Sequence, residues 1–530
     1  MANRMTSNTG LLILVILGVV MLQVENTQSA NILGMFPLSA TSHNNVFSAL
    51  TKELAARGHH LTIVTPHPIK NPPANYTHID VSRAVAPHFK AFGKISVVKV
   101  LDMHVKLLDV TVSVCEDVLS LPEMKELMDP KKYGKKFDLM LISHFFSECF
   151  YPYAEIYDVP VVTMSPAGAF PTTDMMFGNI ALPSFVPNAF FSFSDQMTFL
   201  ERSMNFVSYL GSSIYMKYFI IPAEEKVAKK HFKEISPLTE TLKRNSIILL
   251  NNHFTYNYPR PLTPNMIEVG GIHVKSPNPL PKDLQKFMDD AKDGVIYFSM
   301  GSNLKSSTFS PALQSALMSA FSELRQRVLM KYEADTPIPG QPPNVRLEKW
   351  LPQSDLLAHP NMKLFITHGG LLSFQEAVAR GVPVIGIPIF GDQEMNMQKV
   401  VKLGVGMQVP FAELSKEKLL KAMKEVLGDA KYRNNMKALS NRAMDQPEHP
   451  LQRAVFWTEY VMRHKGAGHL KPASLDLDWC QLFMVDVILV LVSIPTVLLF
   501  GLYYFVCRCC CGRKRQPAQV PKSKNKDKRQ

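Results

Sequence analysis

The sequence predicts an α/β protein with two doubly wound, Rossmann-like domains that face a cleft, followed by a C-terminal transmembrane helix. Short apolar runs of strand length alternate with helical segments that carry apolar residues along one face. The alternation stops in a polar, proline-rich stretch at 256–281 and then begins again, which indicates a linker between two domains. A last apolar run at 482–506 is long enough to cross a bilayer. A chain of 530 residues accommodates two such domains.

The first domain is expected at 31–255 and opens with the apolar run 31–38, which predicts a buried strand. A helix is predicted at 44–57, because apolar residues recur along one side of this segment and Gly58 follows it. Further short apolar runs predict strands at 61–65, 137–142 and 159–164.

The second domain is expected at 282–445 and repeats the pattern. Its predicted strands lie at 294–300, 328–332, 363–367 and 383–389. Its predicted helices lie at 311–324, 371–380, 416–427 and 432–444. Alternation of strand and helix in both halves predicts two parallel sheets.

A glycine-rich turn, His368-Gly369-Gly370, connects a predicted strand to a predicted helix. Glycine permits a tight turn, and the N-terminus of the following helix offers free N–H groups and a partial positive charge. This arrangement suits an anion of the size of a pyrophosphate. A glycine pair alone is weak support, so the residues around it decide the interpretation.

The stretch 350–393 reads WLPQSDLLAHPNMKLFITHGGLLSFQEAVARGVPVIGIPIFGDQ and resembles the signature block of the animal UDP-glycosyltransferases, the UDP-glucuronosyl and UDP-glucosyl transferases. The resemblance covers nearly all of the chain after residue 30, including 445–479. It implies the GT-B fold, and a segment at 446–480 that crosses back onto the first domain. It also implies an enzyme that transfers glucose or glucuronic acid from a UDP-sugar to a hydroxyl of a small lipophilic acceptor, with inversion.

The resemblance assigns donor-binding roles to side chains whose chemistry suits them. Trp350 stacks on the uracil, Gln353 lies beside the base, and Glu376 accepts hydrogen bonds from the ribose hydroxyls. The other expected donor contacts are His368 and Gly370 at the pyrophosphate, Asp392 and Gln393 at the sugar hydroxyls, and Ser302 on the wall of the site.

One departure from the family pattern lies directly after the glycine turn. Animal relatives often carry Ala-Asn-Gly there, whereas this chain has Leu371-Leu372-Ser373, which is closer to an insect-like pattern. An asparagine contact with phosphate is therefore not expected, and Ser373 is its candidate substitute. The insect-like features favour UDP-glucose over UDP-glucuronate as the donor.

Catalysis of this kind needs a base that removes the proton of the attacking hydroxyl, and histidine titrates near neutral pH. His43 follows the first strand and opens the first helix, where the family keeps its catalytic histidine. Relatives place an acidic partner at the position that Ser143 occupies here. Glu148 is the candidate replacement, while Asp138 lies at the strand start, too far away. Three outcomes stay open: Glu148 substitutes, His43 works alone, or the protein binds without turnover.

The acceptor side is expected in an apolar part of the first domain. Residues 137–201 contain no Lys or Arg, and phenylalanines gather in the later part of this stretch. Such a composition is typical of a pocket for a lipophilic acceptor, of a surface lying on a membrane, or of ordinary core. We favour the lipophilic acceptor, since such compounds partition into the bilayer beside a membrane enzyme.

Two segments predict where the protein resides. Residues 1–30, with the apolar run 11–22 behind Arg4, are typical of a secretory signal peptide. Residues 482–506 predict a single membrane span, and the basic tail 507–530 places the C-terminus in the cytosol. A type I protein of the endoplasmic reticulum membrane is therefore expected, with lumenal catalytic domains. The final KDKRQ resembles a dilysine retrieval signal, and Asn75 begins a glycosylation sequon.

The distribution of charge argues against a nucleic-acid-binding protein, and the positions of the cysteines suggest their chemical state. The net charge is +13, of which the tail 508–530 supplies +8 with nine Lys/Arg and one Asp, so a nucleic-acid partner is not expected. Cys115 and Cys149 are expected in an oxidising lumen, but the sequence leaves their pairing open. The cysteines at 507–511 are candidates for palmitoylation.

No paired acidic motif of a metal-dependent nucleotide-sugar enzyme is visible, so neither a metal nor a cofactor is expected beyond the UDP-sugar itself. Whether copies of the chain form a homo-oligomer stays open. The competing function is a catalytically impaired, glycosyltransferase-like protein that binds a UDP-sugar or a lipophile. A NAD-type dehydrogenase is excluded, because the first strand lacks the GxGxxG fingerprint.

Overall fold

A computed structural model describes residues 29–92, 100–302 and 304–511. Within this range the chain forms two compact units, 1–472 and 473–530. The expected signal peptide, apart from residues 29 and 30, and the basic tail beyond residue 511 lie outside the described residues.

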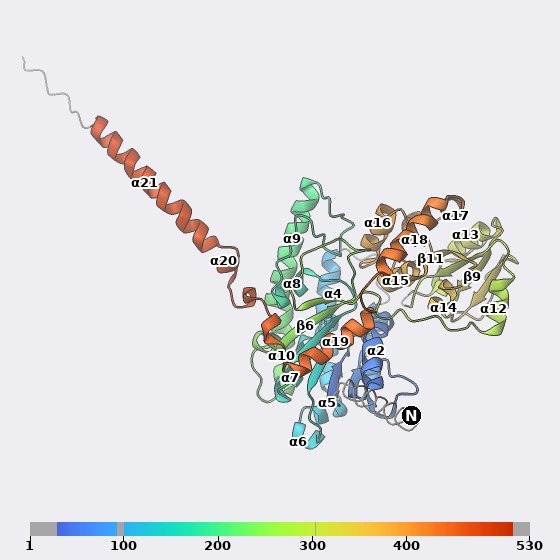
Figure 1. The fold of residues 1–530 in the computed structure, drawn as a ribbon, viewed down its shortest axis with the longest axis horizontal. Helices are drawn as coiled ribbons and strands as arrows, with labels where there is room; N and C mark the ends of the chain where they lie inside the picture. Colours follow the sequence, from blue (N-terminus) through green and yellow to red (C-terminus); the bar gives the residue numbers. More distant parts are fainter. Residues whose placement is uncertain (1–28, 93–99, 303, 512–530) are drawn as a thin grey trace, which may run out of the picture. The chain divides into compact units, whose positions relative to one another are not determined.

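The first sheet is parallel, with seven strands in the order β3-β2-β1-β4-β5-β6-β7. We call this sheet and its helices the first lobe (Figure 1). The strands are β1 (Asn31–Met35), β2 (His60–Thr65), β3 (Tyr76–Asp80), β4 (Leu139–Ser143), β5 (Val161–Ser165), β6 (Asn245–Leu250) and β7 (Met266–Glu268). Nearly every residue of β1, β4, β5 and β6 is buried, which is why these strands read as continuous apolar runs.

The second sheet is also parallel, with six strands in the order β10-β9-β8-β11-β12-β13, and belongs to the second lobe. Its strands are β8 (Val295–Ser299), β9 (Arg327–Lys331), β10 (Val345–Glu348), β11 (Met362–Thr367), β12 (Val384–Gly386) and β13 (Gly406–Gln408). Both sheets share the doubly wound order. Successive strands are first added on one side of the first strand, and the later strands are then added on its other side. The predicted α/β class with two Rossmann-like lobes is therefore confirmed.

Helices connect the strands and complete both lobes. Those of the first lobe are α2 (Thr41–Ala56), α3 (Ser82–Phe92), α4 (Val100–Leu119), α5 (Pro122–Leu127), α6 (Pro130–Tyr133), η2 (Glu148–Phe150), α7 (Pro152–Ile156), α8 (Pro171–Phe177), α9 (Phe199–Tyr215), η3 (Met216–Ile220), α10 (Ile221–His231), α11 (Leu238–Thr241) and η4 (Leu242–Arg244). Those of the second are α12 (Lys282–Asp289), η5 (Ser306–Thr308), α13 (Pro311–Ser322), α14 (Gln353–Leu357), α15 (Leu371–Arg380), α16 (Gln393–Lys402), η6 (Phe411–Glu413), α17 (Lys416–Gly428) and α18 (Ala430–Met444).

The stretch 256–281, expected as a linker, is partly sheet. Its residues Met266–Glu268 form β7, which pairs with β6 and extends the first sheet to its last strand. A three-residue strand among prolines shows no period of its own, so the sequence does not reveal it.

The segment after α18 returns to the first lobe, as the resemblance implies. Helix α19 (Pro450–Arg463) packs on α2, and its Ala454, Val455 and Val461 join the core of the first sheet (Figure 1). Glu459 of α19 pairs with Arg57 at 3.6 Å, so apolar packing and charge both fix this return.

The first unit ends after the short turn η7 (Gly468–Leu470). The second unit contains the turn η8 (Ala473–Leu475), followed by α20 (Trp479–Leu482) and α21 (Val485–Cys511). Helix α21 has 27 residues and a rise of about 40 Å, enough to cross the hydrocarbon core of a bilayer. Its apolar side chains are exposed, which suits lipid rather than a protein core. The structure therefore contains one C-terminal helix that could span a membrane.

Candidate active site

The predicted site residues gather where the strand order reverses. In an open parallel sheet, ligands bind beyond the carboxyl ends of the strands at this point. In the first lobe the reversal lies between β1 and β4, and His43 follows the first while Ser143 ends the second. In the second lobe it lies between β8 and β11, which lead to Ser302 and His368 respectively. The fold therefore gathers residues that are far apart in sequence into two groups, one at the reversal point of each sheet.

The N-terminus of α15 is open to an anion. Gly370 caps it with φ −64° and ψ 142° and supplies no side-chain hydrogen bond. The first intrahelical bond runs from the N–H of Phe374 to the carbonyl of Gly370, so the preceding N–H groups have no partner inside the helix. These N–H groups can cradle a pyrophosphate.

Two glycines make room for the imidazole of His368. A Cβ on Gly301, whose φ is +81°, would lie 2.5 Å from Cε1 of His368. A Cβ on Gly370 would lie 2.5 Å from Nε2 of the same ring. Any larger residue at position 301 or 370 would displace the imidazole of His368, so both glycines are needed for the position of this ring.

His368 is uncharged at neutral pH. Burial, with a contribution from nearby Lys331, lowers the pKa of His368 to about 4. Lys331 ends β9, donates a hydrogen bond of 2.6 Å to the carbonyl of Gly301, and lies 5.8 Å from the ring centre of Trp350. The sequence analysis missed Lys331, although a lone lysine in an otherwise apolar predicted strand was a signal. The positive charge beside the anion site therefore belongs to Lys331.

Gln353, Ser373 and Glu376 lie together and are joined by hydrogen bonds. Nε2 of Gln353 donates to Oε2 of Glu376 at 2.5 Å and to Oγ of Ser373 at 3.1 Å. Burial raises the pKa of Glu376 to about 7, against the hydrogen bond from Gln353. Trp350 is 73% exposed, so one face of its indole is open for stacking.

The residues assigned to the sugar lie at the start of α16. Asp392 accepts a hydrogen bond of 2.9 Å from Nδ2 of Asn396, which also donates to the carbonyl of Gly369 at 3.1 Å. Oε1 of Gln393 accepts from the backbone N–H groups of Ile389 and Phe390, at 2.9 and 3.1 Å. The side-chain oxygen of Gln393 thus holds the loop at 389–390 in place, and its NH₂ group is left to donate a hydrogen bond to a ligand. Asn396, which the sequence analysis missed, ties this loop to the glycine turn.

His43 lies in the first turn of α2, and no carboxylate of the residues that the structure describes is hydrogen-bonded to it. Its Nδ1 is buried, and none of the described residues forms a hydrogen bond with this atom. Its ring packs edge-on against Phe145 with centroids 5.1 Å apart. Burial, and then His67, lower the pKa of His43 to about 4. Oγ of Ser143 is likewise buried without a hydrogen-bond partner in the described part of the chain.

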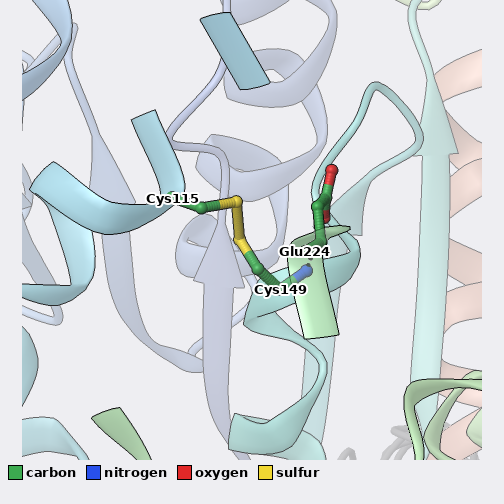
Figure 2. A group of neighbouring side chains, drawn as sticks. All are labelled: Cys115, Cys149 and Glu224. Carbon is green, nitrogen blue, oxygen red and sulfur yellow. Dashed lines mark hydrogen bonds between the residues drawn. A yellow bond between two sulfur atoms is a disulfide. The ribbon is translucent and has the colours of Figure 1, made fainter. Parts of the chain in front are cut away.

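Glu148 contacts another carboxyl group rather than His43. It is 2% exposed on η2, and its carboxyl group lies beside that of Glu224 on α10, close enough for the two groups to affect each other's pKa. Glu224 also accepts from the backbone N–H of Cys149 at 2.7 Å, beside the disulfide that joins Cys149 to Cys115 (Figure 2). Burial raises the pKa of Glu148 to about 7, and burial together with the neighbouring Glu148 raises the pKa of Glu224 well above its ordinary value, because two adjacent buried carboxyls cannot both ionise easily.

The cluster of Cys115, Cys149 and Glu224 also has the residue types of a metal site, but both sulfurs are used in the disulfide (Figure 2). The pairing that the sequence left open is therefore settled, and the disulfide fixes η2 to α4.

The Glu148–Glu224 pair makes the stability of the fold depend on pH. Both carboxyls have a raised pKa in the folded state, so the stability that their protons contribute is fully present below about pH 4.5 and is lost as pH rises through the folded-state pKa values, which is about 7 for Glu148. Glu224→Gln keeps the acceptor for Cys149 and removes one charge. We expect it to raise the free energy of unfolding by about 1–3 kcal/mol at pH 8 and by much less at pH 5. Thermal melts of both proteins across this range measure the difference; an offset independent of pH would contradict the account.

Comparisons with known proteins agree with this geometry. The family model described as UDP-glucoronosyl and UDP-glucosyl transferase matches residues 35–517. UDP-glycosyltransferase UGT5 of Dactylopius coccus is 38% identical over 493 residues, covering 90% of this chain and 92% of the relative. UDP-glucuronosyltransferase 2B7 of Homo sapiens is 36% identical over 409 residues, covering 76% and 74%.

Solved structures show the same two-lobed fold. UDP-glucose: anthocyanidin 3-O-glucosyltransferase in complex with UDP aligns with a TM-score of 0.56 at 15% identity, covering 83% of this chain and all of that one. The calicheamicin glycosyltransferase CalG4 aligns with a TM-score of 0.53 at 20% identity, covering 82% and 99%. At such identities the likeness concerns the fold alone, and it confirms the GT-B arrangement.

Proposed function

Because the chain belongs to the UDP-glucuronosyl and UDP-glucosyl transferase family, and is therefore a glycosyltransferase that uses a UDP-sugar, we propose that it transfers glucose or glucuronic acid to a hydroxyl of a small lipophilic acceptor, with inversion. One observation carries this proposal. The open N-terminus of α15, which follows β11, and the uncharged His43, which follows β1, each lie at the reversal point of their sheet's strand order.

His43 is the general base of the proposed reaction. With its pKa near 4, the imidazole is uncharged at neutral pH and has a lone pair for the acceptor hydroxyl proton. As that proton moves to His43, the acceptor oxygen bonds to the anomeric carbon, and the bond between this carbon and the UDP oxygen breaks. The charge on the departing UDP is stabilised by the free N–H groups of α15 and by His368. Attack opposite to the leaving group inverts the anomeric centre.

The donor contacts complete the proposal. Trp350 and Gln353 hold the base, Glu376 the ribose, and Ser302, Ser373, His368 and Gly370 surround the phosphates. Asp392 and Gln393 hold the sugar hydroxyls. The hydrogen-bonded trio of Gln353, Ser373 and Glu376 supports this assignment, since it presents a carboxylate beside the open helix end. The proposal requires no metal ion.

Of the three catalytic outcomes, we favour His43 acting without an acidic partner. The contacts of Glu148 lead to Glu224, and neither His43 Nδ1 nor Glu148 Oε2 has a hydrogen-bond partner among the described residues. A role for Glu148 as partner therefore needs a rearrangement of η2, which the disulfide and α10 oppose.

Ser143→Asp tests whether a charge at this position controls the base. An opposite charge near an imidazole favours its cation, so we expect the pKa of His43 to rise by about 1–3 units. Activity requires uncharged His43, so the acidic limb of kcat/KM should move to higher pH by the same amount. Ser143→Asn is the neutral control of similar size and should leave the limb in place. If the acidic limb of the kcat/KM profile of Ser143→Asp lies at the same pH as in the wild type, residue 143 does not face His43.

Apolar surface on the first lobe supports a lipophilic acceptor and residence at a membrane. Phe170 and Phe190 stack with centroids 6.0 Å apart, and Phe191 and Phe193 stack at 4.7 Å. Helix α9 exposes large apolar side chains, among them Phe199, Leu200, Phe206, Val207 and Leu210. With α21 as anchor, the proposed location is the membrane of the endoplasmic reticulum, with both lobes in the lumen and the C-terminus in the cytosol.

The test of the function is product formation by the full-length chain in detergent or microsomes. A panel of phenols, alcohols and carboxylic acids is offered with UDP-glucose and with UDP-glucuronate, and glycosides are identified by mass together with UDP release. We expect a β-linked glycoside with at least one lipophilic acceptor. Binding of UDP without glycoside across the panel would instead indicate an impaired, binding-only protein.

A further inference from the structure

A small cavity lined by both apolar and polar residues lies beside Asp392, between the two lobes. Its volume is about 50 Å³, room for a few water molecules or the polar edge of a ligand. Its polar lining comes from Asn252, Asn257, Tyr258 and Arg260 on one side, and from Asp392, Asn396 and Lys399 on the other.

Lys399 is a buried cation without an ion pair. Its side chain lies on α16 and is 4% exposed. Among the described residues, Nζ of Lys399 has neither a hydrogen bond nor a salt bridge; its nearest aromatic contact is the ring of Tyr258, with the centre 5.4 Å away. Burial lowers the pKa of Lys399 to about 7, against the attraction of Asp392. A buried lysine is costly unless an anion is close, so this one is poised to receive a negative group.

The other cations near this cavity are already neutralised. Arg260 forms a two-pronged ion pair with the buried Asp174, with contacts of 2.5 and 2.6 Å. Lys402, one turn beyond Lys399, pairs with Asp195. Lys399 is thus the cation of the lining that still lacks a partner in the described part of the chain.

The geometry of α16 directs Lys399 toward the sugar end of the site. Residues 392, 396 and 399 share one face of the helix, and side chains on a helix tilt toward its N-terminus, where Asp392 lies. The hydroxyl of Tyr258, in the same lining, is also buried without a hydrogen-bond partner among the described residues. Two donors without acceptors therefore lie next to the residue assigned to the sugar hydroxyls.

We propose that Lys399 is the counter-ion of a carboxylate carried by one of the two substrates, and that it thereby determines substrate selectivity. The carboxylate belongs either to the uronic acid of the donor or to an acidic acceptor. The inference rests on the proposed function, because it places the carboxylate beside the transferred sugar. A carboxylate fits because it can accept from both the ammonium group and the phenol, whereas a neutral hydroxymethyl group leaves the buried charge unpaired.

Lys399→Met tests this role, since methionine keeps the volume and removes the charge. Lys402→Met is the matched control, because Lys402 lies on the same helix and 5.2 Å from the same Tyr258 ring but is paired with Asp195. KM and kcat are measured for UDP-glucuronate and UDP-glucose with a neutral phenol, and for a neutral and an acidic acceptor with each donor. Displacement of bound UDP by each UDP-sugar gives a binding readout that does not depend on turnover.

The expected result is a loss of about 10- to 100-fold, confined to the substrate with the carboxylate and expressed in KM rather than kcat. Confinement to UDP-glucuronate assigns the carboxylate to the donor, and confinement to the acidic acceptor assigns it to the acceptor. An equal loss for charged and neutral substrates, no loss in Lys399→Met, or a wild type that uses neither kind of acid would overturn the inference. Failure of the proposed function looks different: wild type then makes no glycoside from any UDP-sugar.

Discussion

Replacing His43 by alanine is expected to lower kcat about 10²- to 10⁴-fold, the usual contribution of a general base. The reason is that a neutral alcohol is a poor nucleophile until a base takes its proton. Among the described residues, none forms a hydrogen bond with Nδ1 of His43, so no neighbouring group is placed to replace it as the base. The loss should depend on the acceptor. Aliphatic alcohols, which need the base most, should lose the full amount, whereas acidic phenols that are already ionised at the assay pH should lose little.

Binding measurements separate this loss from damage to the fold. UDP binds on the second lobe in the proposed mechanism, so its affinity should be the same in wild type and His43→Ala. His67→Ala is the control: the His67 ring lies 2.8 Å from the carbonyl of Ser39, and its removal takes away a neighbour that contributes to the lowered pKa of His43. That variant should remain active. Full activity of His43→Ala toward an aliphatic alcohol would remove His43 from the role of base.

Replacing Glu376 by alanine is expected to weaken UDP binding about 10- to 100-fold, the range for hydrogen bonds to a charged acceptor. Glu376 is the carboxylate that Gln353 holds beside the helix end, and its proposed partners are the two ribose hydroxyls. Because the carboxyl has a pKa near 7, the affinity of wild type should improve as pH rises through 7, while that of Glu376→Gln should stay constant.

A double-mutant cycle with 2′-deoxy-UDP identifies the contact. If Glu376 accepts from the 2′-hydroxyl, removing the hydroxyl and removing the carboxylate affect the same interaction, so their free-energy costs will not add. Strict additivity would show that Glu376 acts elsewhere. Glu376→Gln is the structural control, because glutamine retains the volume and can still contact Gln353.

The fold could be predicted where strands are buried on both faces. The predicted strand 363–367 and helix 371–380 correspond to β11 (Met362–Thr367) and α15 (Leu371–Arg380), since a continuous apolar run and a helical stripe are local signals. The strands β3, β10 and β13 were missed because they are short or alternate with polar residues. β6 (Asn245–Leu250) was missed as well, although it is buried along its whole length. The predicted strand 383–389 is observed only as Val384–Gly386, because the chain leaves the sheet to form the loop before α16.

The placement of a candidate residue could be predicted where it follows a strand at a reversal point, as His43 and His368 do. It could not be predicted where the partner comes from a distant helix. Glu148 was proposed as the partner of His43 by sequence proximity, but its direction is set by Glu224, 76 positions later, which no local pattern reveals. Lys399 was missed for the same reason: its burial depends on Tyr258 of the other lobe.

The central claim is that the two reversal points together form a site for a UDP-sugar, and calorimetric titration of UDP into the full-length chain in detergent tests it most directly. The account predicts saturable binding at one site per chain, weakened in Glu376→Ala and unchanged in His43→Ala. A folded chain that releases no heat with UDP, UDP-glucose or UDP-glucuronate would contradict it.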